Sequence, residues 1–213
     1  MIINFSDEPV NENKKSIFLA GPTLRNSTFE QSWRKQATEI LKELGFDGVV
    51  YVPEFSKKES PFDLTNQASW ERKALLNASV IVFYIPRKLP ELPGFTTNVE
   101  FGMYLSKKPK QVLLCCPFDS EKNSYLEWLY NVEKPNATIF RTLEEVLNEA
   151  VKQQYLNHLS DDIFTVKYRV RSTGRLFEIN PLIDDSFFDA ILKANFRSGE
   201  YILISGELPE KWR

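Results

Sequence analysis

The feature that most constrains the fold is a series of short, continuous apolar runs, each followed closely by a proline. The runs are Ile17–Ala20, Val49–Val52, Val80–Ile85 and Val112–Cys115, and the prolines are Pro22, Pro53, Pro86 and Pro117. An apolar run of four to six residues bounded by turn residues predicts a strand that is buried on both faces. Because such strands occur in parallel sheets covered by helices on both sides, the series predicts an α/β domain.

Segments with helical spacing separate these runs. Apolar residues recur with helical spacing from Phe29 to Leu44, and Gly45 ends the pattern. Further helices are expected at 67–77, 97–106, 121–131 and 142–155, with a short fifth strand at 137–140. Five strands in about 150 residues predict a doubly wound, flavodoxin-like or Rossmann-like parallel sheet with the strand order 2-1-3-4-5.

The pattern changes after Ser160. Residues 164–171 alternate, 172–174 predict a turn, and 176–179 resume the alternation, which together predict a hairpin. A helix over 186–196 and a strand over 201–204 complete a small α+β extension. We therefore expect two domains, 1–155 and 160–213, with the extension packed on the main domain or on a neighbouring subunit.

Composition excludes several kinds of site and partner. The net charge of −2 provides no field that would attract nucleic acid or an anionic membrane, and no apolar run approaches the length of a membrane span. The N-terminus lacks the features of a secretory signal, so a cytoplasmic protein is expected. Cys115 and Cys116 are adjacent and His158 is the single histidine, so we expect no disulfide framework, metal site, Ser-His-Asp triad or cofactor.

Two glutamates are expected at the carboxyl edge of the sheet, where doubly wound folds bind ligands. Glu100 follows the loop after the third strand, and Glu71 lies early in the second helix. Two carboxylates that converge on one cleft suit attack at an anomeric carbon, with one acting as nucleophile and the other managing protons. Cleavage of an N-glycosidic bond uses both roles, because the sugar develops positive charge while the departing base gains a proton.

A structural explanation competes for Glu100. Thr97-Asn98-Val99-Glu100 matches a capping box, in which Glu100 would bond the Thr97 amide, and Thr142 with Glu145 matches a second one. The two explanations are compatible. A carboxyl at a helix N-terminus has a lowered pKa and stays ionised, which is the state a nucleophile needs.

Three stretches carry a resemblance to a known family: IFLAGPTLR, WERKALLNASVIVFYIPR and LPGFTTNVEFGMYL. In their order and spacing they resemble the nucleoside 2-deoxyribosyltransferase family, especially its broad "like" branch, over residues 16–150. The resemblance implies that Glu100, in the Glu-x-Gly that ends at Gly102, is the nucleophile that takes the sugar. It also implies that Glu71 protonates the base, that the substrate is a nucleoside or nucleoside 5′-monophosphate, and that the acceptor is water or another base.

The resemblance further indicates where a substrate would bind. Related nucleotide hydrolases hold a 5′-phosphate with the first loop and the loop before the nucleophile, through amides, hydroxyls and a guanidinium. The residues expected in these roles are Gly21, Pro22, Arg25, Gly94, Thr96, Thr97 and Asn98. Phe18, Trp70 and Phe95 are candidates for stacking on the base, although core packing explains each of them equally well. Relatives often complete their pockets with a neighbouring subunit, so a homo-oligomer is expected.

The sequence departs from the family pattern at three positions. Family members usually have Asp where this chain has Glu71 and Ser79, and classical transferases have Asp where it has Gly94. These departures leave open a catalytically inactive nucleotide-binding sensor or adaptor on the same fold. A third hypothesis rests on a fainter resemblance of LPGFTTNVE to the corresponding loop of cytokinin-type phosphoribohydrolases.

Overall fold

A computed structural model describes residues 1–13, 15–24, 29–56, 63–161, 166–179 and 194–205. The chain divides into two compact units, Met1–Gln154 and Tyr155–Arg213, which are described separately below. The boundary falls within the last helix that packs on the first unit, α5 (Leu143–Asp161).

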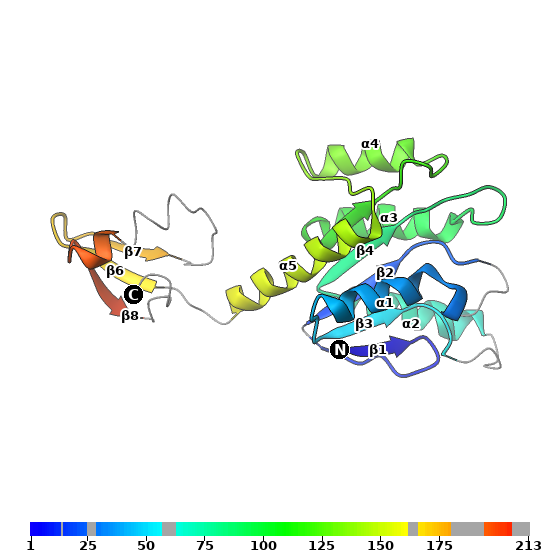
Figure 1. Cartoon of the computed structure of the whole chain (residues 1–213), viewed down its shortest axis with the longest axis horizontal. Helices are drawn as coiled ribbons and strands as arrows, with labels where there is room; N and C mark the ends of the chain where they lie inside the picture. Colours follow the sequence, from blue (N-terminus) through cyan, green and yellow to red (C-terminus); the bar gives the residue numbers. More distant parts are fainter. Residues whose placement is uncertain (14, 25–28, 57–62, 162–165, 180–193, 206–213) are drawn as a thin grey trace. The chain divides into compact units, whose positions relative to one another are not determined.

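The first unit is built on a sheet of five parallel strands (Figure 1). The strands are β1 (Ile2–Phe5), β2 (Ser16–Ala20), β3 (Val49–Val52), β4 (Val80–Tyr84) and β5 (Val112–Cys115), and their order is β1-β3-β2-β4-β5. Ile17 of β2 pairs with Val50 on one side and with Val80 on the other, so β2 is the central strand. The doubly wound, parallel α/β arrangement predicted from the apolar runs is confirmed.

Helices cover both faces of this sheet. On one face α2 (Leu64–Asn77), α3 (Phe95–Lys107) and α4 (Ser124–Glu133) pack on Phe18 and its neighbours; on the other, α1 (Trp33–Glu43) and α5 pack on Ile17 and Leu19. Both sides of β2 are therefore buried, which is why its sequence is continuously apolar. Two 3-10 helices, Phe29–Gln31 and Pro109–Gln111, complete the unit. In the part of the chain that the structure describes, no helix has the length and apolarity needed to cross a bilayer.

The prediction of a fifth strand at 137–140 is wrong. There, a single parallel bridge joins Phe140 to Cys115, and the fifth strand is β1, which pairs with β3 at the opposite edge of the sheet. The sequence pattern hides β1 because a polar residue, Asn4, interrupts its apolar side chains. Asn4 is buried, and its amide group bonds the carbonyl of Pro9 and the N–H of Asn11, which satisfies its polar atoms without solvent.

Helix starts depend on capping residues that the apolar spacing does not reveal. The predicted helix from Phe29 to Leu44 is two helices, because Ser32 caps α1 by accepting a hydrogen bond from the Arg34 amide. Likewise α2 begins three residues before the predicted start, because Asp63 accepts bonds from the amides of Thr65 and Asn66. Capping residues thus correct the predicted helix boundaries.

The second unit contains a three-stranded antiparallel sheet. Its strands are β6 (Val166–Val170), β7 (Leu176–Ile179) and β8 (Tyr201–Ser205), in the order β7-β6-β8. The predicted hairpin and the predicted last strand are confirmed. Residues 194–197 are helical, and the remainder of the helix predicted at 186–196 lies outside the described residues.

Candidate active site

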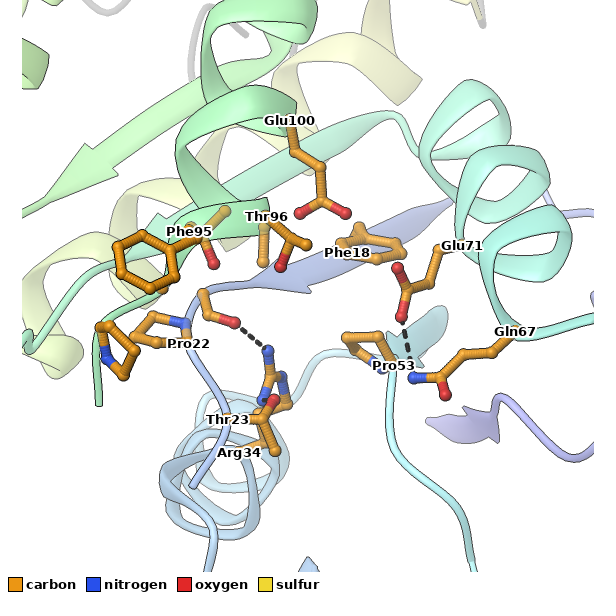
Figure 2. A pocket seen from close by; sticks show the side chains of 15 residues that line it. Phe18, Pro22, Thr23, Arg34, Pro53, Gln67, Glu71, Phe95, Thr96 and Glu100 are labelled. Carbon is orange, nitrogen blue, oxygen red and sulfur yellow. Dashed lines mark hydrogen bonds between the residues drawn. The ribbon is translucent and has the colours of Figure 1, made fainter. Parts of the chain in front are cut away.

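A cavity of about 330 Å³ opens at the carboxyl ends of β2, β3 and β4 (Figure 2). This is the edge at which doubly wound sheets bind ligands. The cavity is lined by Phe18, Ala20, Gly21, Pro22, Thr23, Arg34, Pro53, Gln67, Glu71, Pro93, Gly94, Phe95, Thr96, Thr97 and Glu100. Segments far apart in the sequence therefore meet at one place.

Two glycines let the loops around the cavity approach closely. A Cβ at Gly21 would lie 2.2 Å from the carbonyl oxygen of Tyr84, so the loop after β2 passes against the end of β4 only because this side chain is absent. Gly94 adopts a left-handed conformation with φ of 63°, and a Cβ there would lie 3.1 Å from Cβ of Pro22. The two loops meet at this contact and form one wall of the cavity.

Gly94 also decides where α3 begins. It is the N-cap residue, and the Asn98 amide donates a hydrogen bond to its carbonyl at 3.2 Å. Thr97 therefore lies inside the helix, which has no side-chain cap, and Glu100 lies in the second turn. The predicted capping box at 97–100 is wrong, because the left-handed glycine starts the helix earlier than the Thr-x-x-Glu pattern suggests.

The carboxylates of Glu100 and Glu71 point into the same cavity from α3 and α2 (Figure 2). Gln67, one turn before Glu71 on α2, donates a hydrogen bond from Nε2 to Oε1 of Glu71 at 3.0 Å. This bond fixes the orientation of the Glu71 carboxyl. The structure thus brings the two predicted catalytic residues together.

The pKa values of both glutamates are raised from their ordinary value. Burial is the largest cause for each, and the nearby Glu71 carboxyl adds to it at Glu100, whose pKa rises to about 7. The positive charge of Arg34 lowers both pKa values but does not cancel the effect of burial. The expectation that a helix N-terminus lowers the pKa of Glu100 is wrong, because the carboxyl stands in the second turn, partly buried, beside another acid.

Arg34 is a site residue that the sequence reasoning missed. It belongs to α1, and its guanidinium is buried at the edge of the cavity, where it forms an ion pair with Glu54 at 2.6 Å. The spacing of Arg34, Ala37, Thr38 and Leu41 carries a signal for it, since all four are buried on one face of α1. A charged residue on the apolar stripe of a helix is a candidate for a paired, buried group.

Most of the substrate-binding residues predicted from the resemblance line the cavity. They are Phe18, Gly21, Pro22, Gly94, Phe95, Thr96 and Thr97. Phe95 is 72% exposed at the rim, so its ring is available to a ligand, whereas Phe18 is buried against Trp70 and presents only part of its ring. Thr23, Pro53, Pro93 and Gln67 also line the cavity and were not predicted.

Of the other predicted binding residues, two do not line this cavity and one lies outside the residues that the structure describes. Trp70 is 7% exposed behind Phe18 and Tyr51, and it lines a second cavity of about 740 Å³, with Gln67 between the two cavities. Asn98 does not line the first cavity and accepts a hydrogen bond from Nη2 of Arg87. Arg25 lies outside the described residues.

The cysteines do not contribute to this site. Cys115 and Cys116 are both buried, as expected for small apolar residues at the end of a strand, and burial raises the pKa of each thiol, that of Cys116 to about 12. Within the described ranges, no cluster of three or more His, Cys, Asp or Glu side chains is arranged to hold a metal ion.

Fold and cavity together define a doubly wound α/β domain with a cavity at the carboxyl edge of its sheet. Residues 14–119 match the family model described as "Nucleoside 2-deoxyribosyltransferase like", and through this segment the chain belongs to that family. The family connects the domain to glycosyl transfer on nucleosides. No curated protein matches the sequence significantly.

Proposed function

We propose that this protein cleaves or transfers at the N-glycosidic bond of a nucleoside or nucleoside 5′-monophosphate, with Glu100 as nucleophile and Glu71 as proton donor. The observation that carries the proposal is the convergence of these two carboxylates on one cavity at the carboxyl edge of the sheet. The family match supports the same class of chemistry.

The reaction has two steps. In the first, an oxygen of Glu100 bonds to C1′ while the bond from C1′ to the base nitrogen breaks, and its electron pair leaves with the base. The base receives a proton directly or indirectly from Glu71, so that it departs neutral. In the second step, water or another base attacks C1′, its proton passes to Glu71, and the Glu100 carboxylate is released.

The electrostatics of the cavity support this division of roles. The reaction needs one ionised and one protonated carboxyl, that is, one proton shared by the pair. Burial raises both pKa values, and the neighbouring Glu71 carboxyl raises that of Glu100 further, which disfavours the state in which both carboxyls are ionised. The positive charge of Arg34 acts against the state in which neither is ionised. The pair is therefore suited to hold one proton near neutral pH.

Other residues of the cavity suit the remaining parts of such a substrate. Thr96 and Thr97 lie in the first turn of α3, where hydroxyls and backbone amides favour an anionic or polar group such as a 5′-phosphate or a sugar hydroxyl. Phe95, exposed at the rim on the opposite side of the cavity from Glu71, offers an apolar face to the sugar end of the substrate (Figure 2). We assign the base to the side of the cavity next to Glu71, because that acid supplies its proton.

The test is incubation of the purified full-length protein with a panel of ribo- and deoxyribonucleosides and their 5′-monophosphates. We expect base release, or base exchange when a second base is present, and a covalent glycosyl adduct on Glu100 detectable by mass spectrometry. Glu100→Gln is expected to abolish adduct and turnover, whereas Glu145→Gln, an acid at the start of α5, is the matched control that preserves both. Turnover that persists in Glu100→Gln would refute the proposed role of Glu100.

A second candidate function, an inactive nucleotide sensor or adaptor, is favoured by one observation. Gly94, where classical members have Asp, has no side chain and touches Pro22 in the cavity wall. A contact that an Asp would make is therefore missing from this site. Tight calorimetric binding of an intact nucleotide without turnover across the panel would support the sensor; consumption of every ligand that binds would exclude it.

We also propose that the chain forms a homo-oligomer. Apolar side chains of α3 and α4 are exposed in the first unit, and the two helices pack side by side. They are Phe95, Val99, Met103, Tyr125, Trp128 and Val132, and Phe95 also lines the cavity. A second copy on this surface would border the cavity.

Sedimentation equilibrium tests this interface. Val99→Lys is expected to shift the protein toward monomer, whereas Leu76→Lys, at an exposed apolar position of α2, is expected to leave the assembly unchanged. A wild-type monomer at all concentrations would contradict the proposal. So would an oligomer that both variants preserve.

A further inference from the structure

The buried guanidinium of Arg34 donates four hydrogen bonds to the protein. Its Nε donates to the carbonyl of Leu19 at 2.9 Å, and its Nη2 donates to the carbonyl of Gly21 at 2.6 Å. Its Nη1 donates to Oγ1 of Thr23 at 2.9 Å and to Oε1 of Glu54 at 2.6 Å. The guanidinium therefore ties the end of β2 and the loop that follows it to the end of β3.

Glu54 holds this guanidinium in place. Its side chain is 8% exposed, and the same oxygen that pairs with Arg34 accepts a bond from the Ser32 hydroxyl at 2.6 Å. Ser32 is the N-cap residue of α1, so the start of α1 and the end of β3 are linked through one carboxylate. A buried ion pair with this many partners has little freedom to rotate away.

The charge of Arg34 also bears on the two acids of the cavity. The charged side chains that line the described part of the cavity are Arg34 from α1, Glu71 from α2 and Glu100 from α3. Glu54 from the end of β3 stands behind Arg34, and Tyr104, one turn after Glu100 on α3, is neutral because burial raises its pKa. One fixed cation thus faces three carboxylates.

We propose that Arg34, held by Glu54, is a positioning residue that shapes the cavity wall formed by Gly21 and Thr23 and supplies the positive charge that lets Glu71 and Glu100 carry one negative charge between them. The inference rests on the proposed function for its catalytic meaning. The effect of the Arg34 charge on the titration of Glu71 and Glu100 is a property of the free protein and can be measured without a substrate.

The test compares two substitutions that change the charge near the acids in opposite directions. Arg34→Gln removes the cation, so both carboxyls hold their protons to higher pH; Glu54→Gln removes an anion, so they lose them at lower pH. We expect a shift of about one pH unit in Arg34→Gln and a smaller, opposite shift in Glu54→Gln, because Glu54 stands behind Arg34. A merely structural role would lower activity in both variants without moving the titrations in opposite directions.

The titrations are read in two ways. Carboxyl carbon-13 NMR of the free full-length protein follows Glu71 and Glu100, whose signals are assigned by their loss in Glu71→Gln and Glu100→Gln. The acid limb of the pH profile for base release is measured on the same variants. Arg34→Lys keeps the charge and tests geometry alone: we expect it to leave the acid limb in place and to raise KM at least threefold. If Arg34→Gln fails to fold, the inference is tested by Glu54→Gln, which should lower the pH at which the carboxyls titrate, and by Arg34→Lys, which should leave it in place.

Control variants use the other Arg–Glu ion pair found among the described residues, Arg141 with Glu127, which lies outside the cavity. Arg141→Gln and Glu127→Gln change the net charge equally and are expected to move neither titration. Carboxyl titrations that stay unchanged in Arg34→Gln and in Glu54→Gln, or that shift in the same direction, overturn the inference. If the carboxyl titrations shift in opposite directions in Arg34→Gln and Glu54→Gln but the protein releases no base, the inference is supported and the proposed function fails.

Discussion

Two helices of the first unit begin near the same sequence pattern, Thr-x-x-Glu, and use it differently. At the start of α5 the pattern forms a reciprocal cap: the Thr142 amide donates to Oε2 of Glu145 at 3.0 Å, and the Glu145 amide donates to Oγ1 of Thr142 at 3.2 Å. At α3 the same spacing, Thr97 to Glu100, forms no cap, and both side chains line a cavity.

The difference lies in what precedes each threonine. α3 starts at Phe95 because Gly94 adopts a left-handed conformation three residues before Thr97, so the threonine is already helical. Once its cap role is removed, Glu100 is free to face Glu71, with a raised pKa, whereas backbone N–H groups at Arg141 and Thr142 lower the pKa of Glu145. A short motif thus predicts a helix start only when nothing upstream starts the helix first.

The largest expected difference between the two glutamates is in activity. Glu100→Gln removes the proposed nucleophile and should reduce the rate of base release by about 10³-fold or more. Glu145→Gln should leave that rate within about twofold, because surface substitutions away from the site rarely disturb it. Steady-state kinetics with the best substrate of the panel measure both; equal losses would remove the functional distinction between the two patterns.

The second expected difference is in how stability depends on pH. The folded-state pKa of Glu100, about 7, lies above its ordinary value of 4.5, so the folded protein keeps a proton that the unfolded chain has lost. The free energy of unfolding therefore falls as pH rises from 4.5 to 7, by a contribution on the order of 2–3 kcal/mol. Glu100→Gln should remove this contribution, leave the fall that comes from the raised pKa of Glu71, and be more stable than the wild type at pH 8, as urea unfolding would measure.

Glu145 should show the opposite dependence. Its folded-state pKa is lowered, so its contribution to stability is present above pH 4.5 and is lost as the pH falls below that value. Wild type and Glu145→Gln should therefore differ in unfolding free energy at neutral pH and converge in acid. Parallel pH profiles for the two glutamate variants would contradict the contrast.

The third expected difference is between the N-cap glycine of α3, Gly94, and a glycine inside that helix, Gly102. Gly94→Ala should lower the free energy of unfolding by about 1–2 kcal/mol, because a Cβ strains the left-handed conformation and presses on Pro22. Gly102→Ala, in the middle of the same helix with open space around it, should raise it by about 0.5–1 kcal/mol. Thermal unfolding of both variants decides whether the helix start, rather than glycine itself, is the sensitive feature.

The smallest expected difference is between the two threonines. Thr142→Val removes a cap and should cost about 1 kcal/mol of unfolding free energy without changing the kinetics. Thr97→Val should cost less unfolding free energy than Thr142→Val and should raise KM, because Thr97 caps nothing and lines the cavity. Denaturant unfolding and KM are measured on the same preparations. A larger loss of stability in Thr97→Val, or a raised KM in Thr142→Val, would contradict the prediction.

Much of the fold could be predicted because a strand that is buried on both faces has a continuously apolar sequence. Strands β2, β3, β4 and β5 carry continuous apolar runs, and their pairing follows from the alternation with helices. The edge strand β1 left no such mark, since Asn4 is buried through its own hydrogen bonds rather than by being apolar. The segment at 137–140 looks like a strand locally, yet only Phe140 bridges to β5.

The site was predictable where a residue type has few other uses and hidden where its role depends on packing. Glu71 and Glu100 stand out because acids at the carboxyl edge of a sheet are candidates for chemistry. Arg34 was missed because a helical arginine normally faces solvent, and only its register with Ala37 and Leu41 reveals its burial. The protonation of Glu100 depends on neighbours from two other helices, Glu71 of α2 and Arg34 of α1, which no local pattern encodes.

The N-terminal strand has a practical consequence. The family match starts at residue 14, whereas Ile3 and Phe5 of β1 sit opposite Val50 and Val52 of β3. A shortened protein cut to the family boundaries would expose the backbone amides and carbonyls of β3, a strand whose side chains Val-Val-Tyr-Val are wholly apolar or aromatic. An uncovered rim of that kind invites strand addition by other molecules and aggregation. By covering the edge of β3, the first dozen residues therefore protect the protein from aggregation through strand pairing between copies.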